Sequence, residues 1–353
     1  MSEYHIIRAS EYQKGLYDRG ISKSICVFLM GFNVDRPKSS TFTTKYFIFV
    51  KYIPINYKYM LLRINSLYCI TIQYMMKTIY QSAYRYSVAG VKSIKLFLSS
   101  LKLWPFNVWF DFWFTFPENK LITINDQKYL IRSNTLHSKI VDLYMLTSCI
   151  LDRQYEHANF QIKETDVIID IGANIGSFTI DAARKADKGL ILSFEPDPDN
   201  YLLLENNVKL NNLNNVRIFQ KAVAGVNGKR FIYRDPINNA AHSIIRISSQ
   251  IISVYCLTLS EIFSISKINN CDFLKIDCEG AEYEIIFNTP ADILKRVQKI
   301  TLEYHTPKFH DIENETYTPE NLVKYLKETG FQTTLIKENA IQGAIWAVRK
   351  SAI

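Results

Sequence analysis

The amino-acid sequence predicts an α/β fold built on a doubly wound, mostly parallel sheet of seven strands. An apolar run at residues 167–170 breaks into a turn with Gly172 and Gly176 and resumes as a helical run, the pattern of a first βα unit. The other parallel strands are predicted from apolar runs at residues 189–194, 216–220, 272–277 and 299–304. The closing antiparallel pair is expected at residues 331–336 and 341–348.

The spacing of the glycine turn indicates which ligand this unit binds. A dinucleotide pyrophosphate is bound over G-x-G-x-x-G, but Asn174 stands here where the second glycine of that pattern would be. The carboxylate of Asp170 at the strand tip would repel a pyrophosphate and favour a cationic ligand. S-adenosylmethionine, a sulfonium without phosphate, therefore fits better than a nicotinamide dinucleotide, although a dehydrogenase is an open alternative.

A second acidic residue supports this interpretation. Glu195 follows the next apolar run, about 20 residues beyond the glycine turn, where a carboxylate can accept the hydrogen bonds of both ribose hydroxyls. The alternative is that Glu195 only caps the helix that follows it.

Four motifs occur in order along the chain, at Asp170–Gly176, Phe194–Asp197, Asn206–Asn211 and Phe273–Glu282. Together they resemble the FkbM family of S-adenosylmethionine-dependent methyltransferases, over residues 130–348. The resemblance implies the Rossmann-like class I methyltransferase fold, S-adenosyl-L-methionine as cofactor, and methyl transfer, commonly to a hydroxyl of a sugar, glycan or related metabolite. It does not fix the acceptor.

Residues at the tips of the predicted strands carry the expected chemistry, because neighbouring parallel strands present their carboxyl ends at one edge of the sheet. The expected cofactor-binding residues are Asp170, Gly172, Asn174, Gly176, Glu195 and Asp277. The expected catalytic residues are Asp277 beside the methyl donor, with Glu279 and His305 orienting the acceptor or removing its proton.

Each of these assignments has a structural alternative. Glu279 lies close to a predicted helix start and could act as a cap. Lys275 alternates in phase with Asp277, so it either faces the same site or forms an ion pair with a neighbouring carboxylate. Asp277, Glu279 and Glu303 offer oxygen ligands, but their spacing matches no metal motif, and no metal site is predicted.

The basic charge is concentrated in the amino-terminal part of the chain. Residues 1–130 contain 17 lysines and arginines against 7 acidic residues, a net charge of +10, whereas residues 131–353 have a net charge of −2. We therefore divide the chain into a basic, aromatic-rich accessory region, 1–130, and a methyltransferase domain, 131–353. A near-neutral catalytic domain argues against nucleic acid as a partner, because phosphate binding needs cations near the site.

Within the accessory region, residues 74–103 have the periodicity of a basic amphipathic helix, and residues 104–116 contain three of the four tryptophans. This pattern is compatible with peripheral membrane contact through residues 74–116. The alternative is that the aromatic side chains pack against the catalytic domain. No secretory signal or spanning segment is predicted, so a cytoplasmic location is expected.

Three local features complete the prediction. A hairpin is expected at Leu121–Arg132, with its turn at Asn125 and Asp126, followed by an apolar-faced helix at Ser138–Leu151. A second hairpin is expected within residues 225–257, and His242 in its loop is a candidate contact to the acceptor.

Three functions compete at this stage. The leading one is O-methylation of a sugar, glycan or related small molecule. The second is methylation of nucleic acid or protein, with the basic region as a tether. The third is a non-catalytic scaffold, against which the intact Asp170, Glu195 and Asp277 argue.

Overall fold

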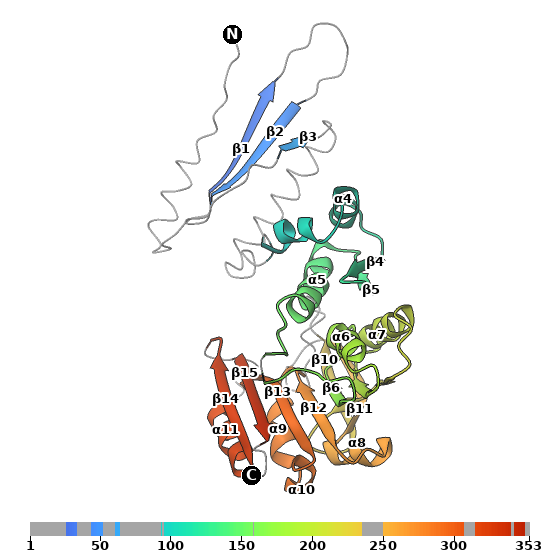
Figure 1. Cartoon of the computed structure of the whole chain (residues 1–353), viewed down its shortest axis with the longest axis vertical. Helices are drawn as coiled ribbons and strands as arrows, with labels where there is room; N and C mark the ends of the chain where they lie inside the picture. Colours follow the sequence, from blue (N-terminus) through green and yellow to red (C-terminus); the bar gives the residue numbers. More distant parts are fainter. Residues whose placement is uncertain are drawn as a thin grey trace. The chain divides into compact units, whose positions relative to one another are not determined.

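The computed structural model describes residues 26–33, 44–51, 61–63, 93, 95–157, 159–234, 250–306, 315–339 and 342–349. The chain divides into two compact units, Met1–Leu98 and Ser99–Ile353 (Figure 1). In the first unit the described backbone forms a three-stranded antiparallel sheet. Its strands are β1 (Cys26–Asn33), β2 (Thr44–Lys51) and β3 (Leu61–Arg63), in that order.

The second unit is organised around a seven-stranded sheet with the order β14-β15-β13-β12-β6-β7-β8. The strands are β6 (Val167–Ile171), β7 (Leu190–Phe194), β8 (Val216–Phe219), β12 (Cys271–Ile276), β13 (Val297–His305), β14 (Phe331–Lys337) and β15 (Gln342–Arg349). Neighbours from β8 to β13 are parallel, and β15 is antiparallel to both β13 and β14. The predicted seven-stranded sheet with its closing antiparallel pair is confirmed.

Helices join and cover these strands. Their bounds are α4 (Phe106–Phe114), α5 (Leu136–Ile150), α6 (Ser177–Lys185), α7 (Pro198–Leu210), α8 (Leu259–Ser266), α9 (Glu282–Asn288), α10 (Ala291–Leu294) and α11 (Pro319–Glu328). A short 3-10 helix, η1 (Ser100–Lys102), precedes α4. The residues at the helix starts explain several of these bounds: Asp197 caps α7 with a proline at the first position, and Thr318 caps α11 in the same way.

The two faces of the central sheet differ in character because side chains alternate along each strand. One face presents apolar residues such as Ile169, Leu274 and Ile300 to a continuous core that includes α8, α9 and α11. The residues in alternate phase are polar near the carboxyl ends of the strands: Asp170, Ser193, Lys275, Thr301, Glu303 and His305. The polar side chains of the candidate site therefore gather on one face of the sheet.

Two smaller sheets flank the central one. The first is the hairpin of β4 (Asn119–Ile124) and β5 (Gln127–Arg132), whose turn residues Asn125 and Asp126 both have positive φ, as a two-residue type I′ turn requires. The second contains β9 (Ala222–Val223), β10 (Gly228–Arg234) and β11 (Gln250–Leu257) in the order β10-β11-β9. Both predicted hairpins are present.

The second unit begins at Ser99, so it includes the β4–β5 hairpin. The predicted boundary was placed after residue 130. The buried amide of Asn207 on α7 fixes the hairpin: Oδ1 accepts from Leu130 N at 2.6 Å, and Nδ2 donates to Leu130 O at 3.1 Å. The same Nδ2 donates to Ile175 O at 2.9 Å, so one side chain joins the hairpin to the segment before α6.

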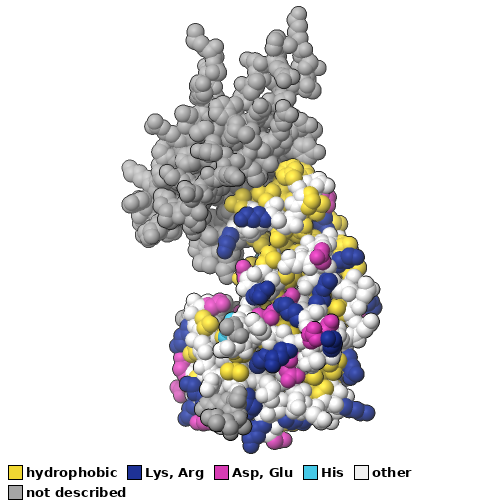
Figure 2. Space-filling model, in the orientation of Figure 1, with side chains coloured by type: hydrophobic (Ala, Val, Ile, Leu, Met, Phe, Trp, Pro, Cys, Tyr) yellow, Lys and Arg dark blue, Asp and Glu magenta, His cyan; other side chains and the backbone are white. Residues whose placement is uncertain are grey.

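The aromatic stretch of α4 is partly buried and partly exposed. The indole N–H groups of Trp109 and Trp113 both donate to the buried Ser100 hydroxyl at 3.0 Å. Phe106 and Phe116 are about half exposed, and Figure 2 shows hydrophobic side chains on the surface at the α4 end of this unit. Packing within this unit therefore explains the buried tryptophans of the stretch but not the exposed phenylalanines. Residues 74–92 lie outside the described residues, so membrane contact through 74–116 stays a prediction.

Among the described residues, no helix has both the length and the apolar character needed to cross a bilayer.

Candidate active site

The turn between β6 and α6 is packed closely against the ends of β7 and β12. The amides of Gly172 and Ala173 both donate to Phe194 O at 3.0 Å, and the amide of Asp277 donates to Ile171 O at 3.1 Å. Gly172 has a φ of +77°, and a Cβ added there would lie 1.8 Å from Asp277 O. Only glycine fits this position, because both the backbone conformation and the neighbouring carbonyl exclude a side chain.

Gly176 and Asn174 shape the rest of the turn. Gly176 caps α6 with a φ of +93°, and a Cβ added there would lie 2.7 Å from Leu204 Cδ1. Asn174 also has a positive φ, of 50°, a conformation that asparagine tolerates better than most residues. Its side-chain Oδ1 is buried and has no hydrogen-bond partner among the described residues. A buried polar acceptor without a partner is the kind of group that a bound ligand satisfies.

Glu195 lies directly after β7 and holds the turn in place. Its Oε2 accepts from Asn174 N at 2.8 Å, and its Oε1 accepts from Asp197 N at 2.9 Å. Burial raises the pKa of this carboxyl to about 7. Glu195 is therefore at the predicted strand tip, next to the turn. It also stabilises the start of α7 through its contact with Asp197. The expected cofactor contact and the structural contact thus involve the same side chain.

Asp170 differs from expectation in its charge environment. Its side chain is fully buried beneath the turn, where Thr179 Oγ1 donates to Oδ2 at 2.6 Å and Lys275 Nζ lies 3.2 Å from Oδ1. Lys275 Nζ also donates to Gly172 O at 2.7 Å. Of the two alternatives left open for Lys275, the ion pair with a neighbouring carboxylate is present. The expectation of an uncompensated negative charge at Asp170 is corrected, because Lys275 neutralises it.

Asp277 stands at the end of β12, next to a tyrosine from the segment after α5. Tyr155 OH donates to Asp277 Oδ2 at 2.8 Å, and its ring packs edge-on against Phe178 of α6. Burial, and then the Asp277 charge, raise the pKa of Tyr155 well above its usual value, so the phenol stays protonated as the donor. The segment after α5 thus lies over the end of β12.

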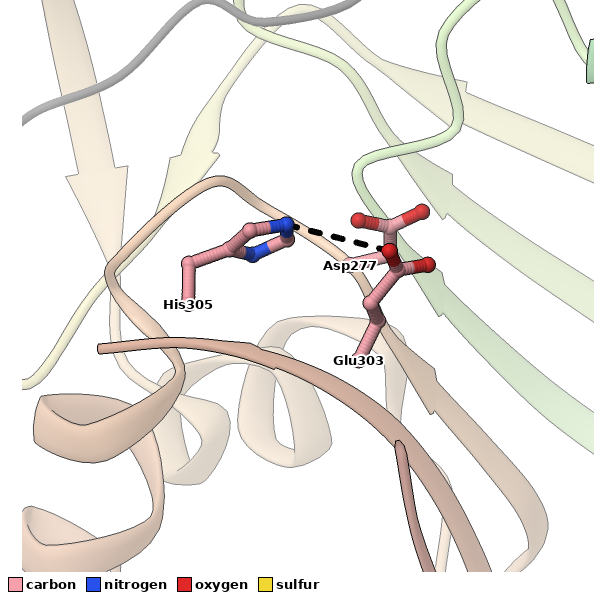
Figure 3. Close-up of side chains that lie close together, drawn as sticks. All are labelled: Asp277, Glu303 and His305. Carbon is pink, nitrogen blue, oxygen red and sulfur yellow. Dashed lines mark ion pairs between the residues drawn. The ribbon is translucent and has the colours of Figure 1, made fainter. Parts of the chain in front are cut away.

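Asp277, Glu303 and His305 come together at the ends of β12 and β13, and their side chains point toward one another in Figure 3. One oxygen of each carboxylate and one ring nitrogen of the histidine all lie within 4.8 Å of one another. The separation of His305 Nε2 and Glu303 Oε1 is 3.8 Å. Burial and the nearby Asp277 raise the pKa of Glu303 to about 8.

His305 is oriented by a buried glutamate. Its Nδ1 lies 3.3 Å from Glu282 Oε1, and the same carboxylate accepts from the amides of Cys278 and Gly280 at 3.1 Å and 2.9–3.0 Å. Nε2 faces Glu279 Oε2 at 3.6 Å. Burial alone would lower the pKa of His305, but Glu279, Glu282 and Asp277 together hold it well above its ordinary value.

The predicted residues therefore form two neighbouring groups at one edge of the sheet. Gly172, Asn174, Gly176 and Glu195 surround the turn with Asp170 below it, whereas Asp277, Glu279 and His305 lie at the ends of β12 and β13. His242 lies outside the described residues.

Three residues at the site were outside the predicted catalytic and cofactor sets: Glu303, Tyr155 and Glu282. Glu303 could have been found from the alternation along β13, since it is in phase with His305. Tyr155 and Glu282 had no such signal, because their contacts come from a loop and from a helix start.

A family comparison identifies this arrangement: residues 170–333 match the model of the methyltransferase FkbM domain. These residues form an FkbM methyltransferase domain. The matched range begins at Asp170 and ends in β14, so it contains the glycine turn, Glu195 and the ends of β12 and β13. The strand order of the sheet is that of the class I methyltransferase fold implied by the sequence motifs.

Two curated relatives with methyltransferase names are similar to part of this chain. Methyltransferase 1 of Beauveria bassiana is 26% identical over 157 residues, which are 38% of this chain and 62% of that protein. The chain thus spans less than two thirds of that relative. Hexuronic acid methyltransferase AglP of Haloferax volcanii is 24% identical over 181 residues, 51% of this chain and 69% of that protein.

Among solved structures, M. jannaschii TYW2 in complex with AdoMet matches with a TM-score of 0.35 and 16% identity. The match covers 67% of this chain and 89% of that one.

Proposed function

We propose that this FkbM domain transfers the methyl group of S-adenosyl-L-methionine to a hydroxyl oxygen of a sugar, glycan or related small metabolite. The observation that carries the proposal is the juxtaposition of a glycine turn with a cluster of carboxylates and a histidine at the same sheet edge. The hexuronic acid methyltransferase of Haloferax volcanii supports a carbohydrate acceptor, because it is a relative over half of this chain.

The residues of the turn fit the cofactor. The unpartnered Asn174 Oδ1 in this turn is suited to hydrogen-bond a polar ligand held close to the backbone. Glu195 would accept the ribose hydroxyls, and Asp277 would lie beside the methyl donor. When bound, S-adenosylmethionine supplies a methyl carbon activated by the sulfonium, so the chain's main contribution is alignment of the acceptor oxygen with that carbon.

The acceptor hydroxyl must lose its proton as it attacks. The side chains of Glu279 and Glu303 are 18% and 19% exposed, whereas that of His305 is 4% exposed behind them. We therefore assign proton acceptance to Glu279 and an orienting role to His305, because a base must reach the hydroxyl that it deprotonates.

The proposal is tested by incubating the full chain with isotopically labelled methyl donor and four acceptors: a hexuronic-acid oligosaccharide, a neutral oligosaccharide, transfer RNA and a mixed protein extract. We expect label on an oligosaccharide hydroxyl, and a rate at least about 100-fold lower for Glu279→Gln. The exposed Glu328→Gln of α11 is the charge-matched control and should keep the wild-type rate. Label confined to the RNA or the protein would refute the assigned acceptor class.

A further inference from the structure

We propose that Asp277, Glu303 and His305 bind a divalent cation of the Mg²⁺ or Mn²⁺ class. Binding of the ion is inferred from the cluster itself, whereas its use in methyl transfer rests on the proposed function. The three residues come from the ends of two adjacent parallel strands, β12 and β13, so the backbone brings them together without a contribution from a loop that would have to move.

The distances are close to those of a coordination sphere. Ligand atoms around an ion with bonds of about 2.1 Å stand about 3 Å apart at right angles and about 4 Å apart across the ion. In this cluster one atom from each residue lies within 4.8 Å of the other two, and Glu303 Oε1 and His305 Nε2 are 3.8 Å apart (Figure 3).

The three side chains are also held in place, because each has another atom bound by a neighbour. Tyr155 OH holds Asp277 Oδ2 at 2.8 Å, and Gln154 Nε2 holds Glu303 Oε2 at 3.0 Å. The buried Glu282 carboxylate lies 3.3 Å from His305 Nδ1. Metal-binding histidines and carboxylates are oriented in this way by surrounding hydrogen bonds, which turn the coordinating atoms inward.

The charges around the cluster favour a cation. Among the described residues, the carboxyl groups of Asp277, Glu279, Glu282 and Glu303 lie around the imidazole of His305. The buried Lys275 is engaged with Asp170 and with Gly172 O. The excess of negative charge is expensive in a partly buried site unless a cation offsets it.

The donor set selects the class of ion. Two carboxylates with one imidazole suit Mn²⁺ and Mg²⁺ and lack the thiolates that select softer metals. Three protein ligands leave positions open on a six-coordinate ion. An acceptor hydroxyl bound there would give its proton to Glu279, its oxygen would form the new O–CH₃ bond, and the C–S bond would break with its electron pair left on sulfur.

The test measures Mn²⁺ alone, with no methyl donor or acceptor. Titration of the full chain, followed by the electron paramagnetic resonance signal of free Mn²⁺, should show one saturable site that Mg²⁺ displaces. Nitrogen modulation in electron spin-echo spectra should report the imidazole. Glu303→Gln and Asp277→Asn should each weaken binding by at least about tenfold, and His305→Ala should also remove the nitrogen modulation.

Two controls keep the test decisive. Glu328→Gln removes one exposed charge far from the cluster in sequence and should leave the Mn²⁺ affinity unchanged. Glu279→Gln removes a charge 3.6 Å from His305 and should change the affinity by only a few-fold, because this carboxylate is outside the proposed coordination set. Thermal melting of each variant shows whether it is folded.

Absence of a saturable site in the folded wild-type chain would overturn the proposal, and so would equal losses in Glu279→Gln and Glu303→Gln. Methyl transfer that persists in excess chelator, together with no Mn²⁺ binding, would refute the cation site and leave the proposed function intact. Mn²⁺ binding without methyl transfer to any acceptor would support the cation site and refute the proposed function.

Discussion

The buried pair of Asp170 and Lys275 shows how one residue can be placed correctly by sequence and still be misread in its electrostatics. Asp170 lies under the glycine turn at the end of β6, where the motif predicts it. The in-phase alternation of Lys275 with Asp277 also indicated a shared face, but not which carboxylate the lysine would reach. That depends on the register of β12 against β6, in which Lys275 is directly opposite Asp170.

We expect Lys275→Met to lower the free energy of unfolding by about 3–5 kcal/mol, because it leaves the Asp170 carboxylate buried without its counter-charge. The double variant Asp170→Asn with Lys275→Met should recover most of that loss, since no unpaired charge is left. Urea denaturation of the two single variants and the double variant measures the coupling. Strictly additive effects would show that the two side chains do not act as a pair.

At Gly172 the prediction concerns a contact between backbones. Gly172→Ala should destabilise the fold by at least about 2 kcal/mol, because the added Cβ would meet Asp277 O and the turn would have to move away from β12. Gly228→Ala is the matched control, since Gly228 also has a positive φ, of 131°, but open space around its Cβ position. The difference between the melting temperatures of the two variants measures the effect of the clash separately from that of the positive φ. Equal losses would show that backbone strain alone accounts for the effect.

At the scale of elements, periodicity and turn residues predicted most of the second unit. The strands from β6 to β15 in the central sheet, the β4–β5 hairpin and α5 were all expected close to their observed bounds. The helix α4 was not predicted as a helix, because nearly all of its residues are apolar and no face stands out by periodicity. The position of the hairpin was also unpredictable, since it depends on single side chains of α7.

Asn207 carries the clearest prediction at this scale. Asn207→Ala should lower the free energy of unfolding by about 2–4 kcal/mol, because it leaves the backbone groups of Leu130 and Ile175 without their buried partners. The half-buried neighbour Asn206→Ala on the same helix is the control and should cost less than about 1 kcal/mol. Denaturant titration gives both values. A loss no larger than that of the control would mean that the hairpin is held by other contacts.

At the scale of the whole molecule, the order of the strands determines where chemistry is possible. The strand order places β6 between β7 and β12, so the glycine turn, Glu195 and Asp277 meet at one edge although Gly172 and Asp277 are 105 residues apart in sequence. The sequence motifs predicted this meeting because parallel strands end together. The contacts that orient His305 and Asp277 were not predicted, because Glu282 reaches His305 from a helix start and Tyr155 reaches Asp277 from a loop.

The central claim is that this sheet edge binds the nucleoside cofactor of a methyltransferase and not a dinucleotide. Calorimetric titration of the full chain with S-adenosylhomocysteine, and separately with NAD, tests it most directly. We predict saturable binding of one S-adenosylhomocysteine per chain, weakened at least about tenfold by Glu195→Gln through loss of the ribose contacts, and no binding of NAD. Binding of NAD with no heat from S-adenosylhomocysteine would contradict the account.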